Sequence, residues 1–423
     1  MTTTVLVVGS GGREHALAWR LSLDPGVERV LVAPGNAGTA RTSKLENVSI
    51  AATDIAGLIA LVQREAVDFT VIGPETPLSL GIVDQFQAQG LPVFGPRQNA
   101  AELESSKAFA KDFLARHQIP TAAYQVFTEL EPALAYIDQR GAPIVVKADG
   151  LAAGKGVVVA TTISDAKAAV TDMLGGRFAA AGARVVIEEF LSGVEASYIV
   201  IAAKQDFVPM ATSQDHKRVG AADTGPNTGG MGAYSPAGVV TPEIEARIHS
   251  EIIAPTLAGM AAEGRPFTGF LYAGIMIDAQ NNPRVLEFNT RMGDPETQPI
   301  LARLASPLLP VLQAAANNTL SGQTLAWDAR VALGVVLCAE GYPGEVRKND
   351  VIVGLVDADA ATLVFHAGTK ALGDAVLTDG GRVLCVVGLG ADTQTAKAAA
   401  YGRAEKITWP GRFMRPDIGW RAV

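Results

Sequence analysis

A glycine-rich segment with two lysines, residues 144–159, has the residue types that bind a nucleoside triphosphate. Its pattern predicts a strand that carries Lys147, a turn that contains Lys155, and a returning strand. Glycine lets a backbone approach phosphate groups closely, and lysine can neutralise their charge. The spacing is not that of a Walker A loop, and a flexible hairpin with a solvated lysine is the alternative. The glycines of this turn are Gly150, Gly154 and Gly156.

A second segment, residues 284–291, predicts a strand with polar side chains on one face. Glu287 and Asn289 alternate along it and therefore point to the same side, as does Arg291 if the strand continues. Carboxylate and amide oxygens suit Mg²⁺, which bridges triphosphate oxygens. A polar sheet edge is the alternative. The two segments together predict an ATP-driven enzyme with a magnesium site.

A long polar stretch between the two segments suggests a substrate site. It contains Gln214-Asp-His-Lys-Arg218 and a glycine-dense run over residues 225–234. Long loops of this kind inside a compact domain are usually functional. We expect Lys217, Arg218 and exposed amides to hold a carboxylate or phosphate, whereas His216 is either part of the site or an ordinary structural histidine.

Near the N-terminus, Gly9-Ser-Gly11-Gly12-Arg-Glu14 follows an apolar strand and opens a helical pattern. Backbone N–H groups at such a helix start can bind phosphate. The run lacks the last glycine of a dinucleotide-binding motif, because Glu14 occupies that position. A phosphorylated substrate is the favoured interpretation, and a dinucleotide or a merely tight turn are the alternatives.

A strand with paired glutamates, Glu188 and Glu189, runs into a loop with Glu195 nearby. The backbone of such a hinge can pair with an adenine edge, and Glu195 can accept hydrogen bonds from ribose hydroxyls. The alternative is that these glutamates are solvated, as paired glutamates usually are.

Composition limits the classes of protein that fit. The 423 residues are 48% hydrophobic and carry a net charge of −8, which suits two to four folded domains and argues against wholesale nucleic-acid binding. Cys338 and Cys385 lie in apolar runs and predict buried strand cysteines. We find no signal-peptide pattern and no apolar run of the ~18 residues that a bilayer requires, so we expect a soluble, cytoplasmic protein.

The elements that must position these residues follow an α/β pattern. Short apolar runs at residues 4–8, 29–33, 69–72 and 91–94 alternate with helical patterns, which predicts a doubly wound parallel sheet with ligands at the carboxyl ends of its strands. Further expected features are helices over 106–117 and 242–263, a helix capped by Ser164 that ends at Gly175-Gly176, strands over 269–277 and 284–289, and a hairpin-like turn at Asp379-Gly380-Gly381. The expected domains are residues 1–103, a linker helix over 104–120, then 121–190, 191–325 and 326–423.

Taken together, these motifs resemble the phosphoribosylamine–glycine ligase family of the ATP-grasp superfamily, and the resemblance runs from end to end. The glycine loop and the Glu287-Phe-Asn289 pair are general to ATP-grasp enzymes, whereas the Asp-His-Lys-Arg and Pro-Asn-Thr-Gly-Gly-Met-Gly segments are more specific. Other motifs that carry it are Gly9-Ser-Gly-Gly-Arg-Glu-His15, Pro34-Gly-Asn-Ala-Gly38, Gly73-Pro-Glu75 and Ser106-Lys107-Ala-Phe109.

The resemblance implies an N-terminal α/β domain, an ATP-grasp lid and central domain, and a C-terminal α/β domain. It implies ligation of glycine to 5-phosphoribosylamine with ATP and Mg²⁺ or Mn²⁺, through a glycyl phosphate, by a monomer that binds neither nucleic acid nor membrane. The implied metal ligands are Glu287 and Asn289. The implied ATP contacts are Lys107, Lys147, Gly154, Lys155, Gly156, Glu188, Glu189, Leu191 and Glu195. The implied catalytic residues are Arg291, Asp215 and Lys217, and the implied substrate contacts are Gly11, Gly12, Asn227, Gly229 and Gly230.

Three alternatives remain open on the sequence. Another ATP-grasp ligase such as a biotin carboxylase shares the Glu287-Phe-Asn289-Thr-Arg291 pattern. A nicotinamide-dependent oxidoreductase would use the N-terminal sheet, but the second strand ends in Pro34-Gly35-Asn36 where a ribose-binding acid is expected. A non-catalytic nucleotide sensor would bind ATP without turnover.

Overall fold

The N-terminal part of the chain forms the parallel sheet that the alternating pattern predicts. A computed structural model describes residues 2–151, 156–177, 183–355 and 361–422. Its first sheet has the order β3-β2-β1-β4-β5 with every pair parallel. The strands are β1 (Thr3–Gly9), β2 (Val27–Pro34), β3 (Leu45–Asn47), β4 (Phe69–Ile72) and β5 (Val93–Phe94). The helices are α1 (Gly12–Ser22), η1 (Thr39–Arg41), α2 (Ile55–Arg64), α3 (Glu75–Ser79), α4 (Ile82–Ala88) and α5 (Gln98–Ser105).

The strand order reverses between β1 and β4, so the carboxyl ends of these two strands form the crevice where ligands of such sheets bind. Glu14 fills part of this crevice. A Cβ atom at either Gly9 or Gly73 would lie 2.4 Å from the Glu14 side chain. The glycines that end the two strands are therefore needed to admit this carboxylate.

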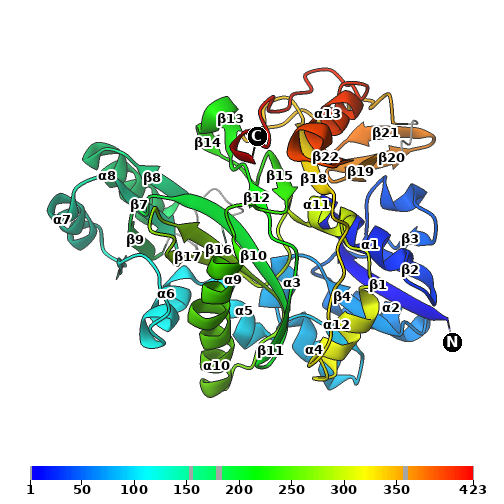
Figure 1. Ribbon diagram of the computed structural model, residues 1–423, viewed down its shortest axis with the longest axis horizontal. Coiled ribbons are helices and arrows are strands. Elements are labelled where there is room, and N and C mark those ends of the chain that lie inside the picture. Colours follow the sequence, from blue (N-terminus) through cyan, green and yellow to red (C-terminus); the bar gives the residue numbers. More distant parts are fainter. Residues whose placement is uncertain (1, 152–155, 178–182, 356–360, 423) are drawn as a thin grey trace.

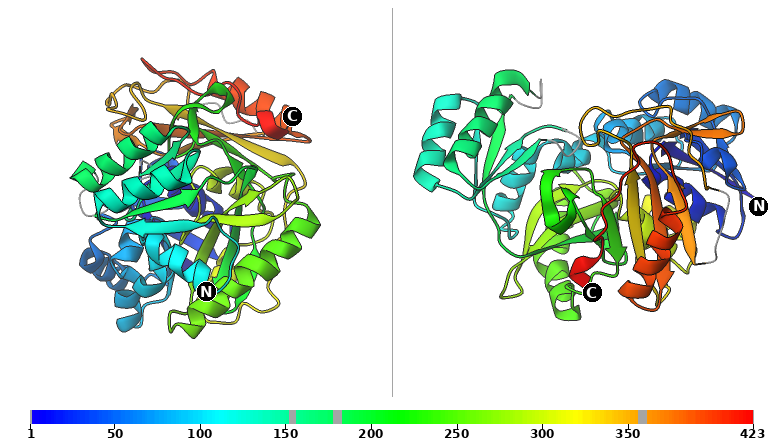
Figure 2. Two further views of the ribbon diagram at one scale, coloured as in Figure 1. Left: turned by 90° about the vertical axis from the view of Figure 1, so that its left-hand side faces the viewer. Right: turned by 90° about the horizontal axis from the view of Figure 1, so that it is seen from above.

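A small unit follows the N-terminal sheet and lies at the opposite end of the molecule from it (Figures 1 and 2). It is a four-stranded antiparallel sheet of order β6-β9-β7-β8 with two helices against one face and its own apolar core. Its elements are β6 (Tyr124–Phe127), α7 (Leu130–Arg140), β7 (Ile144–Ala148), β8 (Val157–Ala160), α8 (Ile163–Asp172) and β9 (Val185–Glu189).

Helix α6 (Lys107–Arg116) connects the N-terminal part to this unit, as predicted for residues 106–117. Ser106 caps it, because its hydroxyl accepts a hydrogen bond from the Phe109 amide. The first turn also binds Asp149, whose Oδ1 accepts from the Ala108 amide at 2.7 Å. This contact fixes the start of the glycine-rich turn beside Lys107.

The central part is an antiparallel sheet of order β11-β10-β16-β17, packed on a long helical segment. That segment begins at Pro242, as predicted, and Thr241 caps it. Its middle, η5 (Ile248–Ile253), is a π-helix between two α-helices. The remaining elements are β10 (Val194–Ala203), β11 (Asp206–Pro209), α9 (Pro242–Arg247), α10 (Ala254–Ala262), β16 (Thr268–Ile277), β17 (Pro283–Asn289), α11 (Thr297–Ala302) and α12 (Leu309–Ala316).

The C-terminal sheet has the order β12-β15-β18-β22-β19 and takes its first two strands from the polar stretch of the central region. It packs beside the N-terminal sheet, where the Asn36 Nδ2 donates to the His366 carbonyl at 2.8 Å. Its elements are β12 (Gln214–Asp215), β15 (Gly232–Ser235), β18 (Val331–Cys338), β19 (Thr362–His366), β22 (Arg382–Gly390) and α13 (Thr393–Ala404). Two ribbons complete this part, β13 (Arg218–Gly220) with β14 (Thr224–Asn227), and β20 (Thr369–Leu372) with β21 (Ala375–Thr378).

Two local predictions are wrong. Thr162, not Ser164, caps α8, since its side chain accepts from the Asp165 amide. The helical segment continues as a π-helix over Met173–Arg177 and leaves the helical conformation at Gly176, as predicted for its end. The turn at residues 379–381 does not join a hairpin, because β21 pairs with β20 whereas β22 pairs with β18 and β19. The cap is a local choice between two nearby hydroxyl side chains, whereas pairing with distant strands decides the outcome at residues 379–381.

Both cysteines are buried in strands of the C-terminal sheet, as predicted. Burial raises the pKa of the Cys338 thiol to about 12, so it stays protonated. Across the part of the chain that the structure describes, no helix is both long and apolar enough to cross a membrane.

Candidate active site

Glu287 of β17 is the centre of a cluster of charged side chains. It lies opposite Gly274 of β16, and Asn289 lies opposite Tyr272, so the two polar residues project from the same face. A Cβ atom at Gly274 would approach the Glu287 Cγ to 3.4 Å, which means that the glycine leaves room beside this carboxylate.

Basic residues surround Glu287. The Lys217 Nζ lies 3.9 Å from its Oε1, and Lys217 also pairs with Glu195. Burial opposes ionisation of Glu287, but the charges of Lys217, Lys147 and Lys107 outweigh burial and lower its pKa. The carboxylate is therefore ionised at neutral pH and lies where several positive charges meet.

Glu188 of β9 joins two lysines in a buried triad. Its oxygens lie 2.7 Å from the Lys111 Nζ and 2.9 Å from the Lys147 Nζ, and all three side chains are less than a tenth exposed. The Lys147 ammonium also donates to the Leu286 carbonyl on β17 at 3.1 Å. Burial opposes ionisation of Glu188, but the two ammonium groups lower its pKa, whereas burial lowers the pKa of Lys111 to about 8. Lys147 thus connects the small unit to the strand of Glu287.

Lys111 was not predicted as a site residue. It stands four positions after Lys107 on α6, and residues at this spacing share one face of a helix. The Lys107 Nζ donates to the Gly150 carbonyl at 2.9 Å, so both lysines face the small unit. The helical spacing was the signal in the sequence that could have identified Lys111.

Arg291 is held by carboxylates from the N-terminal part. Its guanidinium lies 2.7 Å from Glu104 and 3.4 Å from Glu75, and it donates to the Asn289 Oδ1 at 3.0 Å. Glu104 also accepts from the Thr290 amide at 2.7 Å. Glu75 follows strand β4 in a Gly-Pro-Glu turn, whereas nothing in the local sequence marks Glu104.

The glycines of the N-terminal loop lie against Asp294. A Cβ atom at Gly11 or Gly12 would lie 3.6 or 3.7 Å from the Asp294 carboxylate. The Gly11 amide donates to Glu14 at 2.7 Å. A phosphate at this loop, whether of a dinucleotide or of another phosphorylated substrate, would therefore have to replace that contact or use other donors.

Asp294 also lies close to the glycine-dense run over residues 225–234. Arg382 pairs with the Asp294 carboxylate at 3.2 Å and donates to the Gly229 carbonyl. Gly230 packs on Pro295, because a Cβ atom there would lie 2.3 Å from the proline Cδ. The segments around Gly11 and Gly230, far apart in sequence, thus meet at the turn of residues 294–295. Arg382 was not predicted.

Other predicted residues lie elsewhere. Asn227 lies in the β13–β14 ribbon opposite Arg218. Glu189 is exposed and pairs with Arg284 at 3.3 Å, whereas Leu191 is buried. Gly156 accepts a hydrogen bond from the Ala148 amide at 2.8 Å. Gly154 and Lys155 lie outside the described residues.

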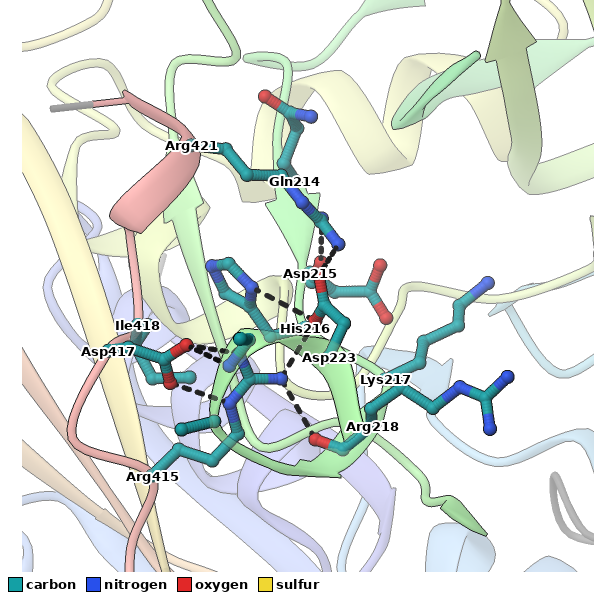
Figure 3. A network of polar contacts seen from close by, with 12 residues as sticks. Gln214, Asp215, His216, Lys217, Arg218, Asp223, Arg415, Asp417, Ile418 and Arg421 are labelled. Carbon is teal, nitrogen blue, oxygen red and sulfur yellow. Dashed lines mark hydrogen bonds and ion pairs between the residues drawn. The ribbon is translucent and has the colours of Figure 1, made fainter. Parts of the chain in front are cut away.

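Asp215 and Lys217 flank His216 in the chain, and Asp215 is buried whereas Lys217 is half-buried (Figure 3). Burial raises the pKa of the Asp215 carboxyl to about 8, although Lys217 acts in the opposite direction. His216 is fully buried, and its Nε2 accepts from the Gly419 amide at 2.9 Å. The interpretation of His216 as a structural histidine is therefore the one that the structure supports.

Glu287 and Asn289 fit a magnesium ion that is shared with a substrate. In the described part of the chain no three His, Cys, Asp or Glu side chains are grouped to hold a metal by themselves. Glu287 forms no hydrogen bond with a described residue, and its ion pair with Lys217 is long at 3.9 Å, so its oxygens are available to a cation. Magnesium at phosphate-transfer sites takes one or two protein carboxylates and completes its shell with phosphates and water.

Comparison with known proteins identifies the family. Models of three phosphoribosylglycinamide synthetase domains match the chain in order, the N domain at residues 3–104, the ATP-grasp (A) domain at 105–297 and the C domain at 332–421. The phosphoribosylamine–glycine ligase of Vibrio vulnificus YJ016 is 59% identical over 421 residues, which cover 99% of this chain and 98% of that protein. The chain belongs to the phosphoribosylglycinamide synthetase family.

Further relatives agree. The phosphoribosylamine–glycine ligase of Salmonella typhimurium is 60% identical over 422 residues, covering 99% of this chain and 98% of that protein. The crystal structure of the Thermotoga maritima phosphoribosylamine–glycine ligase has a TM-score of 0.84 at 32% identity, covering 98% of this chain and all of that one. The predicted family, the α/β fold with an ATP-grasp domain, and the classification as a ligase are confirmed.

The fold is also shared with biotin carboxylases. The biotin carboxylase domain of the Hydrogenobacter thermophilus 2-oxoglutarate carboxylase, solved with ADP, magnesium and bicarbonate, has a TM-score of 0.71 at 15% identity, over 98% of this chain and 92% of that one. At that identity the likeness shows the fold alone. Family membership sets aside the biotin carboxylase, oxidoreductase and sensor alternatives.

Proposed function

We propose that this protein joins glycine to 5-phosphoribosylamine with ATP, giving glycinamide ribonucleotide, ADP and phosphate in purine biosynthesis. The observation that carries the proposal is the cluster around Glu287. It brings Lys147, Lys217 and Arg291 together between the small unit, the central sheet and the N-terminal sheet. Such a cluster suits the transfer of a phosphoryl group to a carboxylate, because positive charges surround the place where negative charge gathers.

We propose that ATP lies between the small unit and β17. Lys107 and Lys147 would contact its phosphates, and the turn with Gly154, Lys155 and Gly156 would lie over them. Glu188, Glu189, Leu191 and Glu195 would border adenine and ribose. Glu195 pairs with Lys217 here, so a contact with ribose would require that pair to open.

Magnesium, or manganese in its place, would neutralise the triphosphate, and Glu287 and Asn289 would hold it. Arg291 already donates to the Asn289 Oδ1, which fixes the orientation of this amide. Lys217 and Arg291 would bind and orient the glycine carboxylate. These side chains do not form a covalent bond with substrate, because the carboxylate of glycine is itself the nucleophile.

The reaction would proceed in two displacements. A carboxylate oxygen of glycine attacks the γ-phosphorus and ADP leaves, which gives glycyl phosphate. The amine of phosphoribosylamine then attacks the acyl carbon, and phosphate leaves with the oxygen that glycine supplied. Asp215 would accept the proton that the amine loses when it is in its ionised form, which is the minor form at neutral pH because burial raises its pKa to about 8.

We place 5-phosphoribosylamine at the meeting point of the two glycine segments. Gly11 and Gly12 would lie near its phosphate, and Asn227, Gly229 and Gly230 would border the substrate. The Arg382 guanidinium would supply positive charge there while Asp294 keeps it in position. The further expectation of a cytoplasmic monomer without nucleic-acid or membrane partners stays a prediction.

The test is ADP release with magnesium-ATP, glycine and phosphoribosylamine formed in situ from ribose 5-phosphate and ammonia. Each component is omitted in turn, and the product is identified by mass spectrometry. Release that requires every component, together with glycinamide ribonucleotide, supports the proposal. Folded protein that releases no ADP, or releases it with bicarbonate and biotin instead, overturns it.

A further inference from the structure

The C-terminal segment, residues 415–421, which we call the C-terminal arm, crosses from the C-terminal sheet to the polar stretch that carries Asp215 and Lys217 (Figure 3). Its first residue, Arg415, has a side chain only 1% exposed. The Arg415 guanidinium donates to the Arg218 carbonyl and to the Asp223 carboxylate, each at 2.9 Å, and to Asp417. A buried arginine with these partners fixes the two segments to each other.

The arm contacts the polar stretch on both sides of Lys217. The Arg421 guanidinium donates to the Asp215 carbonyl at 3.3 Å, and the Gly419 amide donates to the His216 Nε2 at 2.9 Å. Arg415 holds the carbonyl of the residue after Lys217. Figure 3 shows the Lys217 side chain pointing away from the arm. The arm therefore binds the residues on both sides of Lys217 and leaves the Lys217 side chain to point toward the proposed active site.

The same arm stabilises the turn at residues 222–223, whose backbone conformation is unfavourable for the residues that form it. Ala222 and Asp223 have φ angles of 52° and 55°, in the left-handed region that residues with a Cβ rarely adopt. The Ala222 amide donates to Asp417 at 2.8 Å, and the Asp223 carboxylate is shared by Arg415 and Arg421. Because the turn is unfavourable by itself, these contacts with the arm keep it in place.

We propose that the C-terminal arm is a positioning element for the glycine and phosphoribosylamine side of the site, with Arg421 as a positioning residue. The inference rests on the proposed function, because Asp215 and Lys217 are assigned there to those substrates. Among the proposed ATP contacts, Lys107, Lys147 and Glu188 come from α6 and the small unit and have other partners, whereas Glu195 pairs with Lys217. Loss of the arm should therefore affect the two other substrates more than ATP.

The test compares Arg421→Met with a matched control, Arg412→Met. Arg421 is more than a quarter exposed, so its loss should not prevent folding. Among the described residues, Arg412 donates to the carbonyls of Ala404 and Ile407, both in the C-terminal part. We expect Arg421→Met to lower kcat/KM for glycine and phosphoribosylamine by about tenfold and to leave the KM for ATP within about twofold, since a hydrogen bond to a charged group has roughly that effect. Arg421→Lys should recover part of the loss.

Hydrogen exchange separates this inference from the proposed function. In Arg421→Met the amides of residues 214–227 should exchange faster than in Arg412→Met. This comparison does not depend on whether the wild type shows enzymatic turnover. Unchanged exchange in that segment overturns the inference, as does an equal increase in the KM for all three substrates. A wild type that makes no glycinamide ribonucleotide overturns the proposed function while the exchange comparison still tests the arm.

Discussion

The buried triad of Lys111, Glu188 and Lys147 predicts that a second substitution increases the stability of a variant that the first substitution destabilises. Glu188→Gln removes the counter-charge of two ammonium groups that lie 2.7 and 2.9 Å from the carboxylate and are at most 7% exposed. Breaking a buried pair in this way costs about 3–5 kcal/mol. Adding Lys111→Met to this variant removes one of the two uncompensated charges, so we expect the second substitution to restore about half of the lost stability.

The assay is a double-mutant cycle of Lys111→Met, Glu188→Gln and the double variant, followed by urea denaturation and thermal unfolding. An exposed pair of the same unit, Lys167 and Asp138, lies 2.7 Å apart and is the matched control. We expect Lys167→Met to change stability by less than about 1 kcal/mol. The reasoning is refuted if the double variant is less stable than Glu188→Gln, because the Lys111 charge would then not destabilise the protein that lacks the Glu188 carboxylate.

Three further predictions concern the metal residue, a histidine pair and a glycine. Glu287→Ala should abolish turnover without lowering the melting temperature, and normal activity in a folded variant would reject the metal assignment. Burial lowers the pKa values of His15 and His366 from 6.5 to about 3 and about 4, so the fold keeps both neutral. Their contribution to stability is complete above about pH 6.5 and falls as the pH drops, by about 1.4 kcal/mol each at pH 5.5, because the unfolded chain takes up protons there. Because Asp215, whose pKa is raised to about 8, changes stability in the opposite direction over the same range, the measurement compares the urea midpoints at pH 7.5 and 5.5 of the wild type with those of His366→Gln. The same pH difference in both proteins would contradict this. Gly230→Ala should raise the KM for phosphoribosylamine, because Gly230 has a φ of 111° and a Cβ atom would collide with Pro295, whereas Gly402→Ala, with nothing within 4 Å of the added Cβ, should not.

The sequence predicted those features that depend on local spacing. The alternation along residues 284–289 placed Glu287 and Asn289 on one face, and β17 has that register. The helix predicted over residues 106–117 corresponds to α6, and the helix predicted from Pro242 begins there as α9. Patterns of this kind act over one strand or one helical turn and can be read from the chain.

Contacts between distant segments could not be predicted in the same way. Arg291 meets Glu104, and Arg382 meets Asp294, across 187 and 88 positions of the chain, and no local pattern marks these partners. The hydrogen bonds between the C-terminal arm and the residues around Lys217 also join distant segments that no local pattern marks. Lys111 is the exception, because its helical spacing from Lys107 was visible in the sequence.

The central claim is that ATP activates the carboxylate of glycine for attack by the amine of phosphoribosylamine. The most direct test uses glycine with ¹⁸O in both carboxylate oxygens and follows the label in a single turnover by mass spectrometry. The two-step displacement predicts one ¹⁸O in the released phosphate and one in glycinamide ribonucleotide. Phosphate without the label, formed together with that product, would contradict the account, because the oxygen of glycine would then never have bonded to phosphorus.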